Sequence, residues 1–164
     1  MYTKEQIWNS FTKEFRILKH LAEKIPSGGE HHKPTEKQRT TLELMQYIAG
    51  FGGGIFSVIK SGDGMAFAHY AETVKDVTVE NFPAAIDAQE IAMKEMFDEF
   101  TPEFLAEEFS AWGQTQSRGM FLLEGLKMLA AYKLQLFLYA KAAGNHAIGT
   151  SNVWAGMDMP APKE

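Results

Sequence analysis

The sequence predicts an all-α protein, a four-helix bundle formed by one domain that spans residues 1–164. Three observations support this class. Apolar residues recur at spacings of three and four in four long segments, residues typical of helix ends bound these segments, and one connection, at 62–84, is unusually long. A chain of 164 residues suits a single core, because domains cluster at about 100 to 150 residues.

The composition is that of a soluble globular protein and excludes several kinds of site. Hydrophobic residues make up 45% of the chain, and the absence of cysteine excludes disulfides, thiolate nucleophiles and cysteine-ligated zinc. The formal net charge of −5 argues against a nucleic-acid partner, because phosphate binding needs a basic surface. Charged residues interrupt the most apolar segment and no signal peptide is recognisable, so we expect no membrane partner and a cytoplasmic location.

A first helix is predicted over residues 4–25. Thr3 and Gln6 form a capping-box pattern before it, and Pro26 ends it. Its apolar positions fall in one arc: Ile7, Phe11, Phe15, Leu18, Leu21, Ala22 and Ile25. Glu14 points along this arc and is a candidate general base whose pKa burial would raise. The alternative is that Glu14 lies at a bundle end and reaches water.

A second helix is predicted over residues 35–61. Thr35 and Gln38 repeat the capping-box pattern, and Gly62 follows the last apolar position. Tyr47 lies at the margin of a wide apolar arc. Glycines interrupt this arc at four positions, each costing about 1 kcal/mol relative to alanine in a helix interior: Gly50, Gly52, Gly53 and Gly54. Such a cluster implies a kink, the close approach of another helix, or room for a ligand.

The segment 62–84 has no helical period and is expected to be a loop that contains His69. A third helix is predicted over residues 85–100, followed by a short helix that opens at Thr101 and runs to about Phe109. Parallel neighbours need a connection that returns along the bundle, whereas short connections favour antiparallel neighbours. The long loop therefore predicts an up, down, down, up order with the crossover between the second and third helices.

The last long helix is predicted to open near Ser117 and to end at Gly144, a typical C-cap glycine. It is apolar nearly all round, which indicates burial on two sides. The apolar residues outside its core-facing arc are Met120, Leu123, Leu134 and Leu138. We expect this surface to form a homodimer contact. The alternative is that the short helix, or the irregular tail over about residues 150–164, covers it within the same chain.

The sequence contains none of the common catalytic motifs. Phosphate-loop, dinucleotide and H-E-x-x-H patterns are absent, and the five histidines form no i, i+3 or i, i+4 pair on a helix. No catalytic residue is assigned. The candidates for ligand contact lie at or beside apolar helix faces or in the long loop: Tyr47, Met128, Tyr132, Gln135, Glu14 and His69. The ordinary alternatives are core tyrosines and methionines with satisfied or apolar surroundings, and surface positions for the charged groups.

Two segments resemble the DinB-like (YfiT-related) family of metalloenzymes. Near the end of the last helix this family has the pattern His-x-x-x-His-Arg-x-Gln-Leu, and the matching stretch here is MLAAYKLQL at 128–136, with Gly144 as the glycine that follows. In the second helix the family pattern Glu-Leu-Leu-x-His-Ile corresponds to ELMQYI at 43–48. The resemblance implies an up-down-down-up bundle and, for several members, thiol-dependent transferase or isomerase activity with zinc or nickel.

The three positions at which this family places metal-binding histidines hold other residues here: Tyr47, Met128 and Tyr132. Two phenols and a thioether do not replace three imidazoles as ligands of zinc or nickel. We therefore expect no metal or other cofactor. The resemblance instead implies a pocket in the same place, lined by tyrosine hydroxyls, Gln135 and sulfur.

Three functions remain open at this point. The first is the binding of a small, partly apolar molecule in a metal-free pocket between the second and last long helices, with or without acid–base chemistry. The second is a non-catalytic dimeric interaction protein whose centre is filled core. The third is a metal-dependent (thiol) transferase or hydrolase, with zinc or nickel in a rearranged site that includes His69. Whether the protein is an enzyme stays open.

Overall fold

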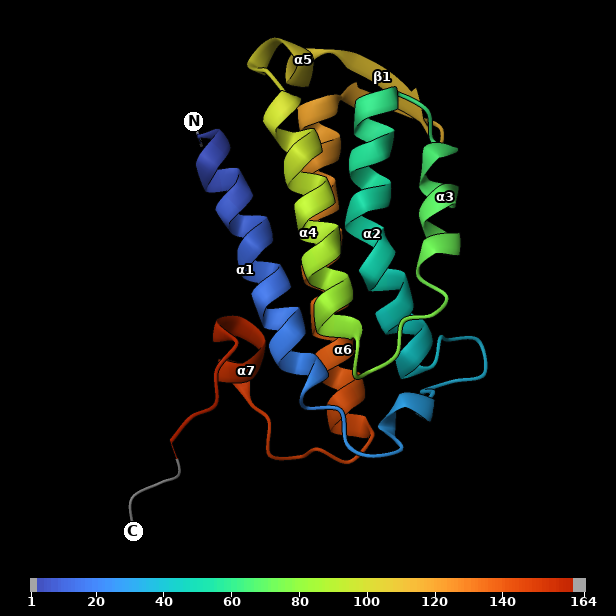
Figure 1. Cartoon of the computed structure of the whole chain (residues 1–164), viewed down its shortest axis with the longest axis vertical. Helices are drawn as coiled ribbons and strands as arrows, with labels where there is room; N and C mark the ends of the chain where they lie inside the picture. Colours follow the sequence, from blue (N-terminus) through green and yellow to red (C-terminus); the bar gives the residue numbers. More distant parts are fainter. Residues whose placement is uncertain (1–2, 161–164) are drawn as a thin grey trace.

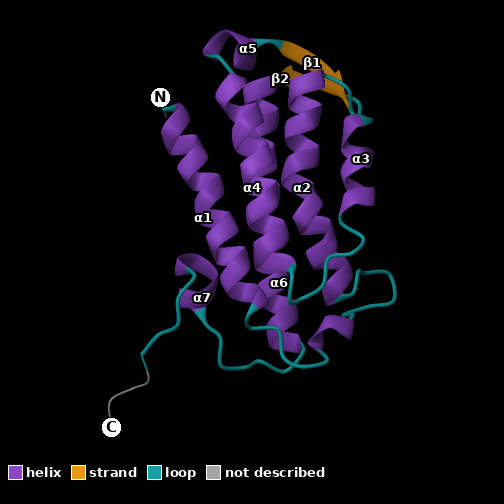
Figure 2. Ribbon diagram, viewed as in Figure 1, coloured by secondary structure: helices purple, strands orange, loops and turns teal. Residues whose placement is uncertain are grey.

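The computed structural model of the chain describes residues 3–160 (Figure 2), and over this range it confirms the all-α class. The helices, one 3-10 turn (η1) and one two-stranded hairpin follow in this order: α1 Lys4–Ala22, η1 Gly29–His31, α2 Thr41–Ser61, α3 Ala66–Thr73, α4 Phe82–Glu99, α5 Pro102–Ala106, β1 Glu108–Ala111, β2 Gln114–Ser117, α6 Arg118–Ala142 and α7 Thr150–Ala155. The hairpin and α3 are not predicted by the periodicity of the sequence.

Four long helices lie side by side and form the bundle: α1, α2, α4 and α6 (Figure 1). Along the chain, α1 and α6 run in one direction and α2 and α4 run in the other. The connection between α2 and α4 returns the chain along the bundle, and its helix α3 packs on α2. The core between the four helices is rich in aromatic rings, of which the following are fully buried: Phe11, Phe15, Phe51, Phe56, Phe82, Phe97 and Phe100.

The helix α2 is long and apolar enough to cross a membrane by length and composition alone. Within its most apolar window, however, 72% of the residues are buried inside the protein. The helix contacts α3, α4 and α6, so its apolar surface is covered on several sides by the rest of the chain. This is the environment of a core helix in a soluble protein.

The end of α1 differs from the prediction. Its N-terminal capping box forms as expected, but the helix ends at Ala22 instead of residue 25. The amides of Lys24 and Ile25 donate to carbonyls three residues earlier, which tightens the chain into turns. Pro26 adds to this effect, because proline disfavours the α conformation in the residue before it.

The start of α2 also differs, since the helix begins at Thr41 and not at residue 35. The working capping box is Thr40 with Glu43: the Thr40 hydroxyl accepts from the Glu43 amide at 3.1 Å, and the Glu43 carboxylate accepts from the Thr40 amide at 2.7 Å. The Thr35 and Gln38 pair forms an isolated turn instead. Both segments carry the same sequence pattern, but only the second leads directly into buried positions.

The segment 62–84 is not a simple loop, because residues 66–73 form α3. The glycines of α2 explain why this short helix packs there. A Cβ atom added at Gly53 would lie 2.4 Å from the Tyr70 ring, and one at Gly54 would lie 2.7 Å from the Phe67 ring. A Cβ atom at Gly52 would meet Met93 of α4 at 2.4 Å. Of the three explanations for the glycine cluster, the structure shows the close approach of neighbouring helices.

The predicted short helix ends early and is followed by a hairpin. α5 stops at Ala106, and Phe109 lies in β1, paired with Gln116 of β2. Trp112 and Gly113 connect the strands with φ values of 51° and 77°. Positive φ at both positions is typical of a type I′ turn, whose twist matches that of paired strands. The α4 and α6 helices lie close to their predicted positions, although α4 begins three residues early at the buried Phe82.

The tail is not irregular throughout, because residues 150–155 form α7. Val153 of this helix is buried, and the Asn152 side chain contacts His20 of α1 at 3.0 Å and Asp158 at 2.8 Å. α7 therefore packs mainly on α1, as Figure 1 shows. The last part of the predicted irregular tail, residues 161–164, lies outside the described residues.

Candidate functional site

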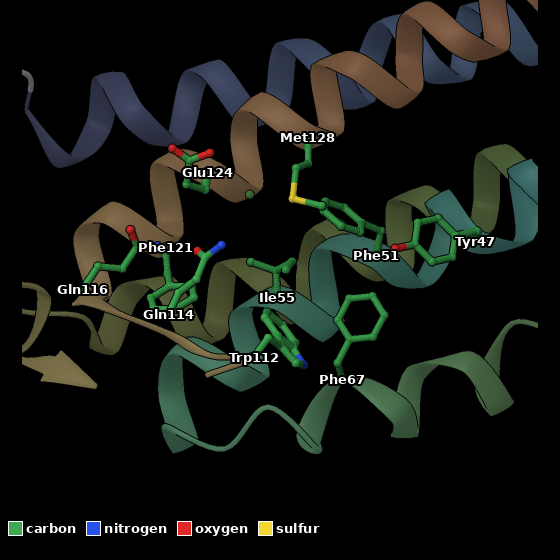
Figure 3. A pocket seen from close by; sticks show the side chains of 11 residues that line it. Tyr47, Phe51, Ile55, Phe67, Trp112, Gln114, Gln116, Phe121, Glu124 and Met128 are labelled. Atoms are coloured by element: carbon green, nitrogen blue, oxygen red, sulfur yellow. The ribbon is translucent and has the colours of Figure 1, made fainter. Parts of the chain in front are cut away.

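A cavity of about 440 Å³ opens between α2, α3, the hairpin and α6. Figure 3 shows the side chains that line it: Tyr47, Phe51, Ile55, Phe67, Trp112, Gln114, Gln116, Phe121, Glu124 and Met128, together with Gly125. The size is in the range of cavities that hold small molecules, and most of the wall is apolar, as is usual for such cavities.

Aromatic rings form a connected wall around this cavity. The Phe67 ring of α3 lies 6.1 Å from Phe51 and 6.0 Å from Trp112, measured between ring centres. Trp112 lies 6.5 Å from Phe121 of α6. All three pairs meet at 63° to 82°, in the edge-to-face geometry that aromatic rings prefer. The wall therefore offers both ring faces and ring edges to a bound molecule.

The framework of the cavity comes from the helical spacing of residues on α2 and α6. Tyr47, Phe51 and Ile55 are four residues apart, so they lie on one face of α2. Gly125 of α6 faces this row, and an added Cβ atom there would lie 2.8 Å from Ile55. The Met128 thioether, one turn further along α6, points towards the Phe51 ring (Figure 3). Gly125 therefore lets α6 approach α2 closely, and Met128 lines the open space one turn further along α6.

The hairpin supplies the part of the wall that sequence reasoning missed. Side chains two apart on a strand share a face, which brings Gln114 and Gln116 of β2 to the cavity, and the turn adds Trp112. A positive φ is unusual for a bulky residue such as Trp112. The Trp-Gly dipeptide was the available signal, but a four-residue strand pair is too short to show a clear alternating pattern.

Tyr47 is the hydroxyl-bearing residue among the side chains that line the cavity. Burial raises the pKa of its phenol well above the ordinary value of 10, and hydrogen bonding with the Tyr132 side chain raises it further. The Arg39 guanidinium lies 4.1 Å from the centre of the Tyr47 ring and has a smaller, opposite effect on this pKa. Tyr47 is therefore a neutral phenol near neutral pH and is able to form hydrogen bonds.

Two polar groups of the wall differ in their state of pairing. The Nε2 atom of Gln116 is buried and has no hydrogen-bond partner within residues 3–160. Leaving a buried donor without a partner costs about 1–3 kcal/mol. Glu124 is paired, since both of its carboxylate oxygens accept from Lys127 of the same helix, at 2.9 and 3.1 Å. Gln116 Nε2 is thus a buried donor that residues 3–160 leave without a partner.

Three of the six residues proposed from the sequence lie at or near the cavity. Tyr47 and Met128 line it directly. Tyr132 packs beside the wall, with its ring centre 5.1 Å from Tyr47 and 5.2 Å from Phe51. The positions matched to the family's histidines therefore do converge in space.

The other three proposed residues lie elsewhere. Gln135 donates to the Tyr139 hydroxyl at 2.9 Å and borders a separate surface groove. Glu14 faces α6 and forms a buried ion pair with Lys133 on the far side of that helix from the cavity. His69 is exposed on α3, because its side chain points away from the glycine face that α3 packs on. A role for these three residues in the cavity is not consistent with the structure.

Comparison of the sequence with protein-family models gives no match, and comparison with curated proteins gives none either. Comparison of the structure does give a match, to a DinB-like protein, YjoA from Bacillus subtilis, with a TM-score of 0.69. The alignment covers 85% of this chain and 92% of the Bacillus protein, at 23% sequence identity. The chain has a DinB-like fold. At this identity the likeness concerns the fold and not the chemistry.

The DinB-like fold raises the question of a metal, and the residues present do not fit zinc or nickel. Within residues 3–160, no three or more His, Cys, Asp or Glu side chains lie close enough together to hold a metal ion. Besides the neutral phenol of Tyr47 and the thioether of Met128, the cavity offers one carboxylate, Glu124, and one carboxylate does not supply the three or more imidazole, thiolate or carboxylate ligands that zinc and nickel favour. The expectation of a metal-free protein remains a prediction.

Proposed function

We propose that this DinB-like protein binds a small, partly apolar molecule in the cavity between α2, α3, the hairpin and α6, without a metal. The observation that carries this proposal is the wall itself: five aromatic side chains and one thioether surround a cavity of about 440 Å³. Large apolar cavities with a few convergent polar groups are the usual form of small-molecule sites. Desolvation of the ligand against these rings supplies the binding free energy.

The polar groups of the wall favour binding over chemistry. Tyr47 is a neutral phenol near neutral pH, and Lys127 engages both oxygens of the Glu124 carboxylate. The candidate base Glu14 lies outside the cavity, paired with Lys133. The glutamine amides offer hydrogen bonds but no proton transfer near neutral pH. These residues support recognition of a ligand, and they assign no acid–base or nucleophilic step.

An environment-sensitive fluorescent probe tests the proposal directly. N-phenyl-1-naphthylamine is neutral and apolar, and its emission rises when it enters an apolar site. We expect saturable binding to the wild type and at least a tenfold loss of affinity in Met128→Trp, because the indole fills the cavity. Met120→Trp is the matched control, since Met120 lies on the same helix, is exposed to a similar extent and does not line the cavity.

The two variants give a clear decision. Loss of probe binding in Met128→Trp with retention in Met120→Trp supports the proposal. Equal binding to both variants, or no saturable binding to the wild type, contradicts it. Circular dichroism of each variant confirms that the helices are retained.

We also propose that the protein forms a homodimer through α6, as an interaction surface independent of the cavity. Four apolar side chains of this helix are between 38% and 53% exposed: Met120, Leu123, Leu134 and Leu138. The two segments of the same chain that could have covered these side chains do not reach them. The helix α7 packs mainly on α1, and the short helix α5 lies at the end of the bundle (Figure 1). Exposed apolar rows of this kind typically mark an interface.

A further inference from the structure

We propose that Gln89 of α4 is a positioning residue of the cavity, because its side-chain amide binds the backbone of α2 and so sets where Phe51 stands in the wall. The inference rests on the proposed binding function and gives a role in it to a residue that does not line the cavity. The Gln89 side chain is buried between helices, where a polar group is uncommon unless its hydrogen bonds are satisfied.

The amide of Gln89 contacts both ends of one helical hydrogen bond of α2. In a regular helix the Gly52 amide donates to the Ile48 carbonyl, four residues earlier. Here the Gln89 Oε1 atom accepts from the Gly52 amide at 2.6 Å, and the Gln89 Nε2 atom donates to the Ile48 carbonyl at 3.2 Å. The same Oε1 atom also accepts from the Gly53 amide at 3.2 Å. A side chain of α4 thus enters the hydrogen-bond ladder of α2.

The glycine at position 52 gives this side chain access to the backbone. A Cβ atom added at Gly52 would lie 3.0 Å from Gln89 Oε1 and 2.4 Å from the Met93 sulfur. The helix α2 lies between α3 and α4 (Figure 1), so Gly53 and Gly54 admit the rings of α3 and Gly52 admits the Gln89 amide from the α4 side. The room that the glycine cluster provides is therefore used on both sides of α2.

The same glycines make this part of α2 easy to deform. Glycine is a poor helix former, because its backbone loses the most freedom on folding. Helices also bend where a side chain inserts into the hydrogen-bond ladder. Three hydrogen bonds from Gln89, formed in the core, hold the deformable segment in one conformation.

The segment that Gln89 binds, residues 48–53, carries the middle of the aromatic wall. Phe51 belongs to this segment, Tyr47 precedes it and Ile55 follows it, and all three line the cavity. A change in the bend of α2 therefore moves these side chains relative to one another. Binding sites need their side chains held within about 0.5 Å of the productive geometry. Gln89 thus determines the shape of the cavity without touching the ligand.

Removal of the amide tests this role with N-phenyl-1-naphthylamine as the probe. In Gln89→Leu the backbone groups of α2 can pair within the helix, so we expect a folded protein, confirmed by circular dichroism. The segment relaxes towards a regular helix, and the affinity for the probe should fall about tenfold. Met93→Ala is the matched control, because Met93 lies one turn further along α4 and packs on Gly52 through its thioether. It should lower the melting temperature but keep the affinity within about a factor of two.

Gln89→Glu adds a pH signature that a loss of packing does not produce. A protonated carboxyl group carries a donor beside an acceptor, like the amide, so it can bind the Ile48 carbonyl and the glycine amides together. A carboxylate has no donor, and its second oxygen would face the Ile48 carbonyl. We expect affinity near that of the wild type at pH 5 and a progressive loss towards pH 9, with the wild type measured at each pH as the reference. The comparison uses the pH range in which circular dichroism shows both proteins folded.

Nuclear magnetic resonance of protein labelled with 15N-glycine observes the backbone without a ligand. We expect the amide resonances of Gly52 and Gly53 to move in Gln89→Leu and to titrate with pH in Gln89→Glu. The amides of Gly113 and Gly144, which lie in turns away from this segment, should stay in place and serve as internal controls.

The outcomes separate this inference from the function beneath it. Wild-type affinity in a folded Gln89→Leu, or an equal loss in Met93→Ala, overturns the positioning role. If Gln89→Leu does not fold, Gln89→Glu decides, and parallel pH curves for this variant and the wild type contradict the role. If the probe shows no saturable binding to the wild type, the proposed function fails, and the glycine amides alone decide whether Gln89 sets the backbone of α2. Unmoved Gly52 and Gly53 resonances in Gln89→Leu then refute it.

Discussion

The ammonium of Lys133 on α6 lies 2.7 Å from the Glu14 carboxylate on α1, and both side chains are shielded from water. The Lys133 side chain is 2% exposed and the Glu14 side chain is 14% exposed. The same ammonium lies 4.8 Å from the centre of the Trp154 ring, which belongs to α7. The contact with Glu14 is an ion pair and lacks the alignment of a hydrogen bond. Three helices thus meet at one buried pair of charges.

We predict that removing one partner of this pair destabilises the protein strongly. Glu14→Gln should lower the free energy of unfolding by about 3–5 kcal/mol, because it leaves a buried ammonium without its counter-charge. The double variant Glu14→Leu/Lys133→Met should recover most of this loss, since apolar pairs replace buried ion pairs well. Urea denaturation measures both. Lys13→Met, at an exposed position of α1, is the control, and equal effects of Lys13→Met and Glu14→Gln would contradict the prediction.

The approach of α3 to α2 predicts an unusual glycine effect. Gly53→Ala should destabilise the protein, although alanine is about 1 kcal/mol better than glycine in an isolated helix. The reason is the 2.4 Å distance between an added Cβ atom and the Tyr70 ring, because overpacking typically costs about 1–3 kcal/mol. Hydrogen exchange over residues 66–73 should become faster. A double-mutant cycle with Tyr70→Ala should show that the two losses are not additive; additive losses would mean that the ring does not cause the effect.

The raised pKa of Tyr47 predicts a change of stability at alkaline pH. The unfolded chain loses the phenol proton near pH 10, whereas the folded protein keeps it, so rising pH favours the unfolded state above that value. Stability should be fully present below about pH 10 and should fall as the pH rises towards the raised pKa of the folded state. Thermal unfolding between pH 8 and pH 11 measures this, and Tyr47→Phe should show a smaller fall than the wild type. Parallel curves for the two proteins would argue against the raised pKa.

We predict that the purified protein contains zinc and nickel only in substoichiometric amounts. The positions matched to the family's histidines hold Tyr47, Met128 and Tyr132, and these groups do not suit either metal. A chelator should therefore leave the melting temperature unchanged. One tightly held ion per chain by elemental analysis would refute the prediction. A variant with histidine at all three positions is the comparison, and second-shell partners for the imidazoles decide how tightly it binds metal.

We predict that the protein is a dimer in solution. Light scattering should give twice the mass of the chain, and Leu134→Glu/Leu138→Glu should dissociate the dimer, because two carboxylates cannot be buried without partners. Both residues are exposed in the single chain, so the double variant should keep the melting behaviour of a folded monomer. Trp112 is exposed to a similar extent and lies outside this surface, so the control variant Trp112→Glu should remain dimeric. A wild type that stays monomeric at high concentration would leave the α6 surface without this role.

Much of the architecture follows from local sequence alone. The 3.6-residue period determines the four long helices, because each must bury one apolar face, and the capping residues determine most of their ends. Thr3 with Gln6 caps α1 as predicted. The convergence of Tyr47, Met128 and Tyr132 was also predictable, since it depends on helix faces and on the resemblance to a known motif.

Other features depend on contacts between segments distant in the sequence. The α3 helix forms because Gly50, Gly53 and Gly54 provide a flat surface for it, and a helix of eight residues is too short to be stable or recognisable alone. Phe67, Trp112 and Gln116 reach the cavity only through that packing and through the hairpin. Glu14 was predicted to face apolar surroundings, but its partner Lys133 lies 119 positions later in the chain. Local periodicity determines which face of a helix is buried, whereas only the tertiary structure decides which side chains meet there.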